Sequence, residues 1–366
     1  MKKTVDKKLL VSILLLVGAG FLIFLSASLG LLARDSAHFG SIAFKQIFFG
    51  LLPGLAALYL FSKFDYMKWR KLSFWLFVLA IFLNIVIFIP SIGFTHNGAT
   101  RWLSIGSFSL QVSEVLKIAA IIYFAAWLSF VRENVKTWRR GFLPLSIILA
   151  ITGALCLIQK DTDTLIVISV ALVSMFIVAG GKWRHVALLA LIGALAFALL
   201  IYERPYIRAR IATFIDPGAQ SLTTGWQIQQ SLIAIGSGGF SGRGFGQSIQ
   251  KFNYLPEPVG DSIFAVAAEE FGFLGSVALI LLFVFFTLRG LKVARGANHP
   301  FGGFLSVGIV SYIITQSFVN IGAMVGVVPL SGIPLLFVSQ GGTALLFVLA
   351  HAGILLNISR TAKMIK

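Results

Sequence analysis

The sequence predicts an all-α membrane protein of one domain, residues 1–366, with about ten transmembrane helices. Hydrophobic residues make up 58% of its 366 residues and its mean hydropathy is +0.93, whereas soluble domains are typically about 45–50% apolar. A transmembrane helix needs about 20 mainly apolar residues. Such segments occur at residues 9–32, 44–61, 72–89, 115–130, 142–158, 165–178, 186–201, 263–288, 304–327 and 341–358.

The basic residues predict how these helices are oriented. Lys and Arg collect on the cytoplasmic side of membrane proteins, and most of the 30 in this chain fall near the termini and in alternate loops. Both termini are therefore expected in the cytoplasm, with any chemistry on the extracytoplasmic face. This topology and contact with anionic membrane lipids account for the net charge of +17, so nucleic-acid binding is not expected.

Cysteine and histidine give no sign of a metal site. Cys156 is the single cysteine, which excludes an intramolecular disulfide and a site built from several cysteines. The five histidines lack the spacing of zinc ligands. No cofactor is evident, and the sequence leaves a requirement for a divalent cation open.

Three connections between the spans are candidates for functional loops. Two are long outer loops, at residues 90–113 and 202–262. Sixty residues without structure are unusual, so a short helix at the membrane surface is expected at residues 226–235. The third, residues 328–342, is apolar but rich in Pro and Gly, which predicts a re-entrant loop covered by protein or by a water-filled cavity.

Asp261 is the strongest candidate for a catalytic residue. It follows Gly260 at the expected start of a helix, where free backbone N–H groups and the helix dipole favour an ionised carboxylate. Small residues follow it at helical spacing and admit a neighbouring backbone closely. These are Ala265, Ala268, Gly272 and Gly275. Asp261 is therefore expected to face protein or a cavity.

Other charged residues allow two interpretations each. Glu114 and Lys117 are three residues apart on one helix face and can form a structural ion pair; we favour the alternative that they line a polar cavity with Arg101 near its mouth. Asp161 opens the span at residues 165–178, where it either caps the helix or lines the cavity.

The glycine run at residues 236–246 lacks the spacing of a nucleotide-binding P-loop. Its backbone amides could hold a pyrophosphate, with Arg243 and Lys251 supplying charge; a flexible surface loop is the other interpretation. Glu269 lies about 80° around the helix from Asp261 and could share its cavity, whereas Glu270 needs another partner.

Several motifs in this order resemble those of the SEDS family of shape, elongation, division and sporulation proteins, which includes FtsW, RodA and SpoVE. The motifs are NGATRWL (97–103), QVSEVLK (111–117), GWQIQQS (225–231), residues 251–270, QSFVNIG (316–322) and SGIP (331–334). The run 251–270 looks more like FtsW than RodA. The resemblance implies a multi-pass glycosyltransferase of the bacterial cytoplasmic (inner) membrane that polymerises lipid II into peptidoglycan for cell division or cell shape.

The resemblance also implies site residues and partners. Asp261 matches the family's essential aspartate. Arg101, Glu114 and Lys117 match charged positions around its cavity, and Lys251 and Glu257 match the approach to it. Undecaprenyl-diphosphate-linked glycan, a class B penicillin-binding transpeptidase and divisome or elongasome proteins are the implied partners. The chain departs from the family pattern at Val112, Lys160, Asp163, Val259, Gly260, Leu336 and Gln340.

The chemistry expected is transfer of a glycan from an activated donor. Asp261 would take the proton of the GlcNAc 4-hydroxyl as general base, while Arg101, Lys117 and either Arg243 or Lys251 would stabilise the departing diphosphate. A lone catalytic carboxylate also suits transfer better than glycoside hydrolysis. The rival interpretations are a lipid II flippase, which inverted repeats would support, and a scaffold that recruits a transpeptidase.

Overall fold

The computed structural model describes residues 5–33, 36–89, 92–96, 99–105, 108–218 and 224–363. Among these, nine helical segments are long and apolar enough to cross a membrane. One further apolar helix, Thr162–Val178, is shorter than these nine. Each coincides with one of the ten expected segments. Lys2, Lys3 and Lys366, which contributed to the predicted orientation, and the motif residues Asn97 and Gly98 lie outside the described residues.

The bounds of the helices are α1 (Lys7–Leu32), α2 (Ser36–Lys45), η1 (Gln46–Leu51), α3 (Leu52–Lys63), α4 (Tyr66–Val86), α5 (Val112–Val131), η2 (Arg132–Lys136), η3 (Trp138–Phe142), α6 (Leu143–Ile158), α7 (Thr162–Val178), α8 (Trp183–Glu203), α9 (Pro205–Ile215), α10 (Thr224–Ser237), α11 (Ile263–Gly296), α12 (Pro300–Met324) and α13 (Gly342–Thr361). The helices are joined by short connections except between α4 and α5, α10 and α11, and α12 and α13. Helix α12 is central, because it packs against α5, α7 and α11.

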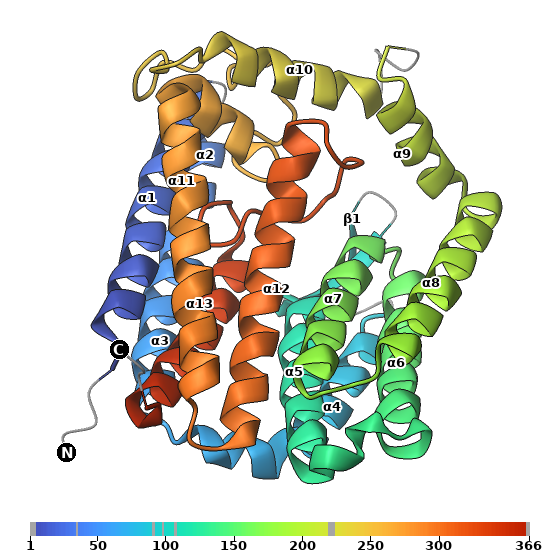
Figure 1. The fold of residues 1–366 in the computed structure, drawn as a ribbon. Helices are drawn as coiled ribbons and strands as arrows, with labels where there is room; N and C mark the ends of the chain where they lie inside the picture. Colours follow the sequence, from blue (N-terminus) through green and yellow to red (C-terminus); the bar gives the residue numbers. More distant parts are fainter. Residues whose placement is uncertain are drawn as a thin grey trace.

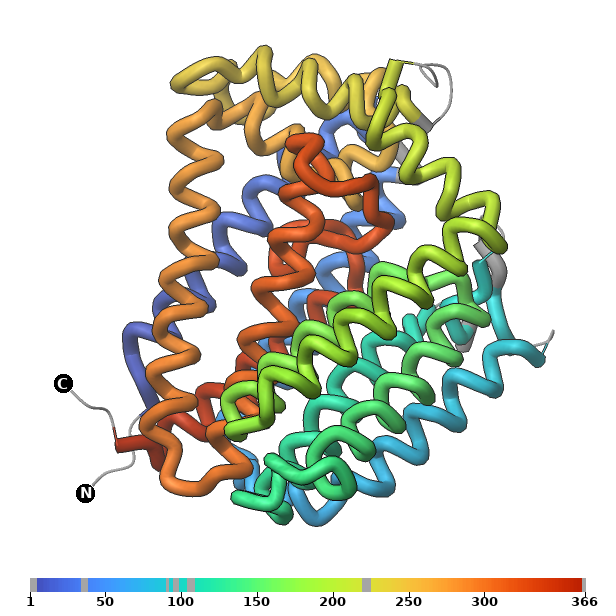
Figure 2. Tube along the Cα trace, turned by 45° about the vertical axis from the view of Figure 1, so that its right-hand side comes forward, coloured from blue at the N-terminus to red at the C-terminus, as the bar shows by residue number. Residues whose placement is uncertain are grey.

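Both ends of the described chain lie at one end of the helix bundle, and α9 and α10 run across the other end (Figures 1 and 2). An even number of spans requires the termini to share a side. The cytoplasmic location of the termini stays a prediction. The helix expected at residues 226–235 is confirmed as α10, and the same loop contains α9, which the sequence reasoning did not anticipate.

A small antiparallel sheet occupies the first outer loop. Strands β1 (Gly93–His96), β2 (Ala99–Ile105) and β3 (Phe108–Gln111) pair in the order β1-β2-β3. The register places Trp102 opposite Gln111. Apolar and polar residues alternate in β3, as in a half-buried strand, but no strand was predicted in this loop. The sheet matters because Arg101 is on its central strand.

Helix α11 is interrupted at Gly272, whose φ of 65° and ψ of −162° are not helical. Asp261 precedes the first helical residue, Ile263, and the capping position is Ser262. The prediction of one continuous face from Asp261 to Gly275 is therefore wrong. The expected close backbone approach does occur at Ala268, since a methyl group on Gly238 would lie 2.1 Å from the Ala268 carbonyl oxygen.

The segment at residues 328–341 has no helix, and it is covered partly by protein and partly by a polar cavity, the two kinds of cover that were predicted. Its residues 335–338 are all buried. Two amides of α12 hold its backbone: Gln316 donates to the carbonyl of Pro334 (3.2 Å), and Asn320 donates to that of Ile333 (2.9 Å). This segment lies beside Asp261 and forms one wall of the site.

Candidate functional site

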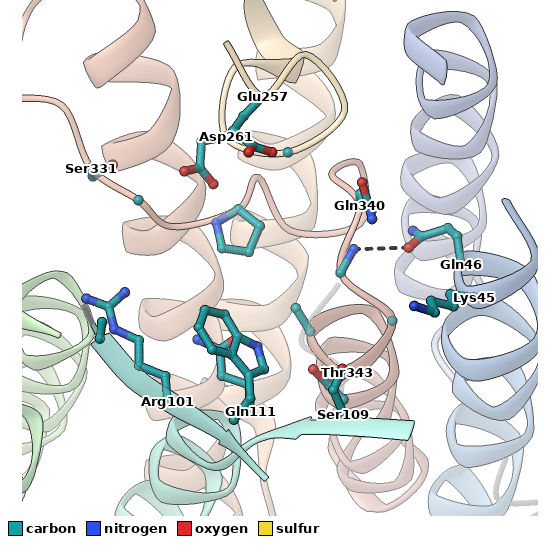
Figure 3. Close-up of a pocket in the computed structure, with 18 of the residues that line it drawn as sticks. Lys45, Gln46, Arg101, Ser109, Gln111, Glu257, Asp261, Ser331, Gln340 and Thr343 are labelled. Atoms are coloured by element: carbon teal, nitrogen blue, oxygen red, sulfur yellow. Dashed lines mark hydrogen bonds between the residues drawn. The ribbon is translucent and has the colours of Figure 1, made fainter. Parts of the chain in front are cut away.

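A polar cavity of about 670 Å³ opens between the sheet, the re-entrant segment and the outer loops. It brings together side chains that are far apart in the sequence (Figure 3). Its charged lining residues are Lys45, Arg101, Arg210, Glu257 and Asp261. Asp261, Glu257 and Arg101 were predicted for the site and line the cavity.

The carboxylate of Asp261 faces this cavity without a hydrogen-bond donor among the described residues. Only its backbone carbonyl is held, by the amide of Asn320 at 2.8 Å. The pKa of Asp261 is raised from 3.8 to about 7, chiefly by burial and then by the carboxylates of Glu257 and Asp163, against the lowering effects of Arg210 and Arg101. We predicted a carboxylate ionised by the helix start. That explanation is wrong, because the side chain does not cap α11.

Arg101 projects from β2 into the cavity, and its guanidinium group is held by backbone carbonyls between α6 and α7. Its Nε donates to the carbonyl of Gln159 (3.4 Å), and another guanidinium nitrogen donates to the carbonyl of Lys160. Asp161 lies 3.8 Å from the same guanidinium. Asp161 also caps α7, accepting from the hydroxyl of Thr164 at 2.9 Å. The capping interpretation of Asp161 is therefore confirmed, and its contact with the cavity is indirect.

Arg210 was missed as a site residue. From α9 it reaches Asp163 at 3.0 Å, and the amide of Gly332 also donates to that carboxylate, at 3.3 Å. A methyl group on Gly332 would lie 3.7 Å from Asp261 Oδ2 and 3.8 Å from Arg210 NH2, so Arg210 and Asp261 are neighbours. In the sequence Arg210 was one of several arginines in a loop. Asp163, one of the positions where the chain departs from the family pattern, holds Arg210 at the cavity through this ion pair.

Glu114 and Lys117 do not line the cavity, so our preferred interpretation of them was wrong. They form an ion pair of 2.7 Å and are 1% and 2% exposed. Gln316 accepts from Lys117 (2.9 Å), and the Tyr312 hydroxyl donates to Glu114 (3.3 Å). The pair therefore fastens α5 to α12 inside the protein.

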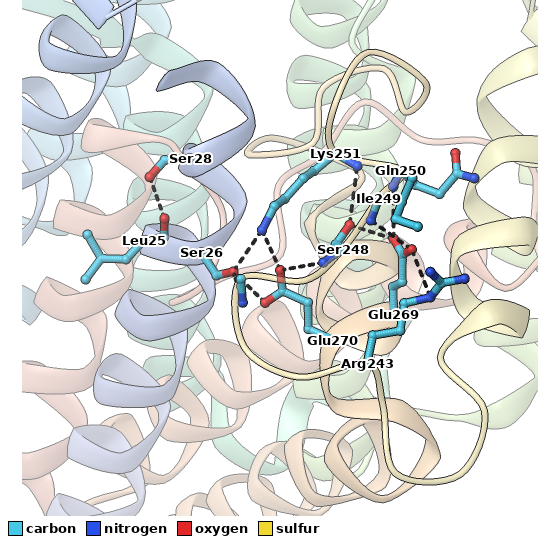
Figure 4. A network of polar contacts seen from close by, with 11 residues as sticks. Leu25, Ser26, Ser28, Arg243, Ser248, Ile249, Gln250, Lys251, Glu269 and Glu270 are labelled. Carbon is cyan, nitrogen blue, oxygen red and sulfur yellow. Dashed lines mark hydrogen bonds and ion pairs between the residues drawn. The ribbon is translucent and has the colours of Figure 1, made fainter. Parts of the chain in front are cut away.

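Lys251, Glu269 and Arg243 were also expected around the cavity, and none of them lines it. They belong to a separate network (Figure 4). Lys251 pairs with Glu270 at 2.7 Å and both are buried. Glu269 accepts from the Ser248 hydroxyl and from the amides of Ile249 and Gln250, and Arg243 lies 3.5 Å away. Glu270 does have a partner other than the cavity, as predicted.

The glycine run holds α11, and three of its successive amides already have acceptors, beginning with that of Gly242, which donates to the carbonyl of Gly238 at 2.9 Å. The amides of Arg243 and Gly244 donate to the carbonyls of Glu269 (3.0 Å) and Glu270 (2.9 Å). Gly242 has a φ of 82°, and a methyl group there would lie 2.1 Å from the Glu270 carbonyl oxygen. Both earlier interpretations of this run, a pyrophosphate cradle and a flexible loop, are therefore replaced by a structural one.

The remaining departures from the family pattern divide between core and cavity. Val112 and Leu336 are buried. Gly260 and Gln340 line the cavity, and the backbone amide of Gln340 donates to the carbonyl of Val259 at 2.7 Å.

Among the described residues, no group of three or more His, Cys, Asp or Glu side chains is arranged to hold a metal ion. A requirement for a divalent cation thus stays untested.

This arrangement suits proton removal beside a developing anion. A carboxyl group whose pKa is near neutrality is an effective general base, and guanidinium groups nearby stabilise a leaving diphosphate.

Residues 7–364 match the model of a family described as cell cycle proteins, FtsW/RodA/SpoVE. Over 366 residues the chain is 40% identical to stage V sporulation protein E of Bacillus subtilis, covering 99% of each protein. Over 350 residues it is 38% identical to the probable peptidoglycan glycosyltransferase FtsW of Saccharophagus degradans, covering 94% of this chain and 89% of the relative.

Two solved structures share the fold. A chain of a peptidoglycan synthase complex, from work on coordination of polymerization and crosslinking, superposes with a TM-score of 0.81 at 24% identity and covers 97% of this chain and 98% of that one. The rod shape determining protein RodA of Thermus thermophilus gives a TM-score of 0.71 at 23% identity over 97% of each chain.

Proposed function

Because the chain belongs to the FtsW/RodA/SpoVE family of cell cycle proteins, we propose that it is a peptidoglycan glycosyltransferase that polymerises lipid II, with Asp261 as its general base. Relatives such as that of Saccharophagus degradans are named probable peptidoglycan glycosyltransferases. The observation that carries the assignment of the base is the Asp261 carboxylate, which faces the cavity with a pKa of about 7 and with Arg101 and Arg210 close by.

In this mechanism the 4-hydroxyl oxygen of the incoming lipid II attacks C1 of the sugar at the reducing end of the growing strand. Asp261 takes the hydroxyl proton. The bond from C1 to the undecaprenyl diphosphate oxygen breaks, and the diphosphate leaves with the electron pair. A general base contributes about 10²–10⁴-fold to such a rate. Arg101 and Arg210 stabilise the leaving diphosphate, in place of the Lys117, Arg243 and Lys251 expected from the sequence.

The names of the relatives favour this polymerase over a lipid II flippase or a scaffold. The protein would act in the cytoplasmic membrane, with the cavity on the outer face, since α9, α10 and the sheet lie opposite the basic termini. A class B penicillin-binding transpeptidase is the proposed partner, because a structural neighbour belongs to a peptidoglycan synthase complex. The curated relatives include SpoVE and FtsW proteins, which supports a role in division or sporulation.

The test is polymerisation of labelled lipid II by the purified protein, alone and with its transpeptidase. Wild type should give glycan ladders, and Asp261→Asn should give none while folding normally. Glu203→Gln, which alters an exposed carboxylate at the end of α8, should match wild type. Ladders from purified Asp261→Asn would contradict the assignment of the base. Transport of lipid II across vesicle membranes without ladders would contradict the polymerase.

A further inference from the structure

We propose that the cavity has a second anion site, formed by Lys45 and the first turn of α13, which binds the diphosphate of the acceptor lipid. We call Lys45, Gly342, Thr343 and Ala344 the α13 site. The inference rests on the proposed function, because it assigns one of the two lipid substrates of that reaction to a place.

The first turn of α13 presents free backbone donors to the cavity. The helix begins after Gly341, a capping residue without a side chain, and it has no acidic residue in its first turn. The first amides of a helix have no acceptor within it. Gly342, Thr343 and Ala344 carry three of these amides, and all three residues line the cavity. Such amides, together with the positive end of the helix dipole, form an anion site.

The side chain of Thr343 gives an independent indication of a ligand. It is 8% exposed and lines the cavity, and within the described part of the chain its hydroxyl has no hydrogen-bond partner. The hydroxyl oxygen keeps contact with the cavity, because it is not among the side-chain oxygens closed off from solvent, and so the hydroxyl can donate to a ligand bound there. An oxygen of a bound anion would satisfy it.

Lys45 supplies the charge. It lines the same part of the cavity and, among the described residues, its ammonium group has no ion pair. In Figure 3 Lys45 and Thr343 lie on the side of the cavity away from Asp261 and Arg101. Glu257 and Asp261 are the carboxylates among the described lining residues, so the α13 site has no acidic residue of its own to compete with an anion.

Gln46 fixes the α13 site in place. Its side-chain oxygen accepts from the amide of Gly341 at 3.0 Å, and its amide nitrogen donates to the carbonyl of Ser339 at 3.3 Å. It begins η1, a π-helical segment, and π-helical insertions are frequent at functional sites. A methyl group on Gly50 of that segment would lie 3.0 Å from Gly342 Cα. The start of α13 is therefore held rigidly beside Lys45.

The covalent structure of the substrates decides which diphosphate binds there. The leaving diphosphate is bonded to the carbon under attack, so it must lie next to Asp261, where Arg101 and Arg210 are. The diphosphate of the acceptor is separated from its reacting hydroxyl by two sugars. It must therefore lie elsewhere in the cavity, and the α13 site offers the other cluster of donors.

The test measures the coupling of two lipid II analogues by the purified full chain in nanodiscs, with KM determined for each analogue while the other is saturating. In the acceptor-only analogue a methylene group replaces the anomeric oxygen, so the diphosphate cannot leave. In the donor-only analogue the configuration of the 4-hydroxyl is inverted, so it cannot accept a glycan. Lys45→Gln and Thr343→Val should each raise KM for the acceptor-only analogue about tenfold, the value of one charge-assisted hydrogen bond, with little change in KM for the donor-only analogue. Thr343→Ser, which keeps the hydroxyl, and Lys63→Gln, which removes a lysine outside the cavity, should give wild-type KM values for both analogues.

Each other outcome overturns the inference in a recognisable way. If wild type couples the analogues and the variants keep the wild-type KM for the acceptor-only analogue, the α13 site is wrong and the proposed function stands. If KM rises for the donor-only analogue instead, the two diphosphates have been assigned the wrong way round. If phosphatidylglycerol competes with the acceptor-only analogue, the site takes any anionic headgroup. If wild type forms no coupled product, the proposed function itself fails.

Discussion

The cavity and the buried network of Figure 4 both contain carboxylates and basic side chains, but these side chains have different roles in the two regions. Glu269 and Glu270 lie eight and nine positions after Asp261, yet both are buried and accept hydrogen bonds from several donors. Asp261 is given no donor by the described residues and has a pKa of about 7. A carboxylate with a full set of partners stabilises the fold. One that lacks them is left available for chemistry.

The largest effect on stability should come from breaking the buried pair of Lys251 and Glu270. Because each charge is 0–1% exposed, Lys251→Met should leave an uncompensated carboxylate and cost about 3–5 kcal/mol in the free energy of unfolding. Denaturant unfolding in detergent measures this. The double variant Lys251→Met/Glu270→Leu should recover most of the loss. A double variant as unstable as the single one would show that packing, not charge, is responsible.

The next prediction concerns Arg101 and Arg243, which were both candidates from the sequence for stabilising the departing diphosphate. Arg101→Ala should lower the rate of lipid II polymerisation about 10²–10³-fold, as expected for removal of a donor to the leaving group. Arg243→Ala removes the partly exposed pair with Glu269 and a 3.4 Å hydrogen bond to the carbonyl of Ser237, both outside the cavity, and should leave the rate nearly unchanged. Steady-state kinetics on both purified variants decides. Equal losses would mean that the cavity of Figure 3 is not the site of reaction.

A smaller effect should appear in the dependence of the rate on pH. If Asp261 must be ionised, kcat/KM should rise with pH and level off above about pH 7, the value of its pKa. Asp163 raises that pKa and also binds Arg210. Asp163→Asn removes a negative charge and frees the guanidinium, so the midpoint of the profile should move to lower pH. A midpoint that stays in place or rises would remove Asp163 from the site.

The last effect is on the stability of Asp261→Asn. The raised pKa means that the folded protein holds a proton on Asp261 between pH 3.8 and about 7 that the unfolded chain has lost. Ionising Asp261 therefore destabilises the fold as the pH rises through this window, and the whole cost is present above pH 7. Asp261→Asn should unfold at a higher temperature than wild type at pH 8, and the difference should vanish near pH 4. Thermal unfolding at both values is the measurement.

The sequence by itself determined the ten spans and three residues of the site. The length of an apolar segment is a local property, because the membrane sets it without reference to the rest of the chain. Asp261, Glu257 and Arg101 were found because motifs carried them, and the cavity confirms that they lie together. The helix at residues 226–235 followed from the same local reasoning.

Only the tertiary structure decided which charges are paired. Lys117 and Lys251 have ion-pair partners in the core, whereas Arg210 and Lys45 reach the cavity. Each of these outcomes depends on which helix, loop or strand packs against another. The cost of burying a charge is offset by its partners. Glu114 pairs with Lys117 within α5, but Gln316 and Tyr312 reach that pair from α12. The role of a charged residue in this protein therefore depends on its neighbours in space. A single sequence does not show which residues those neighbours are.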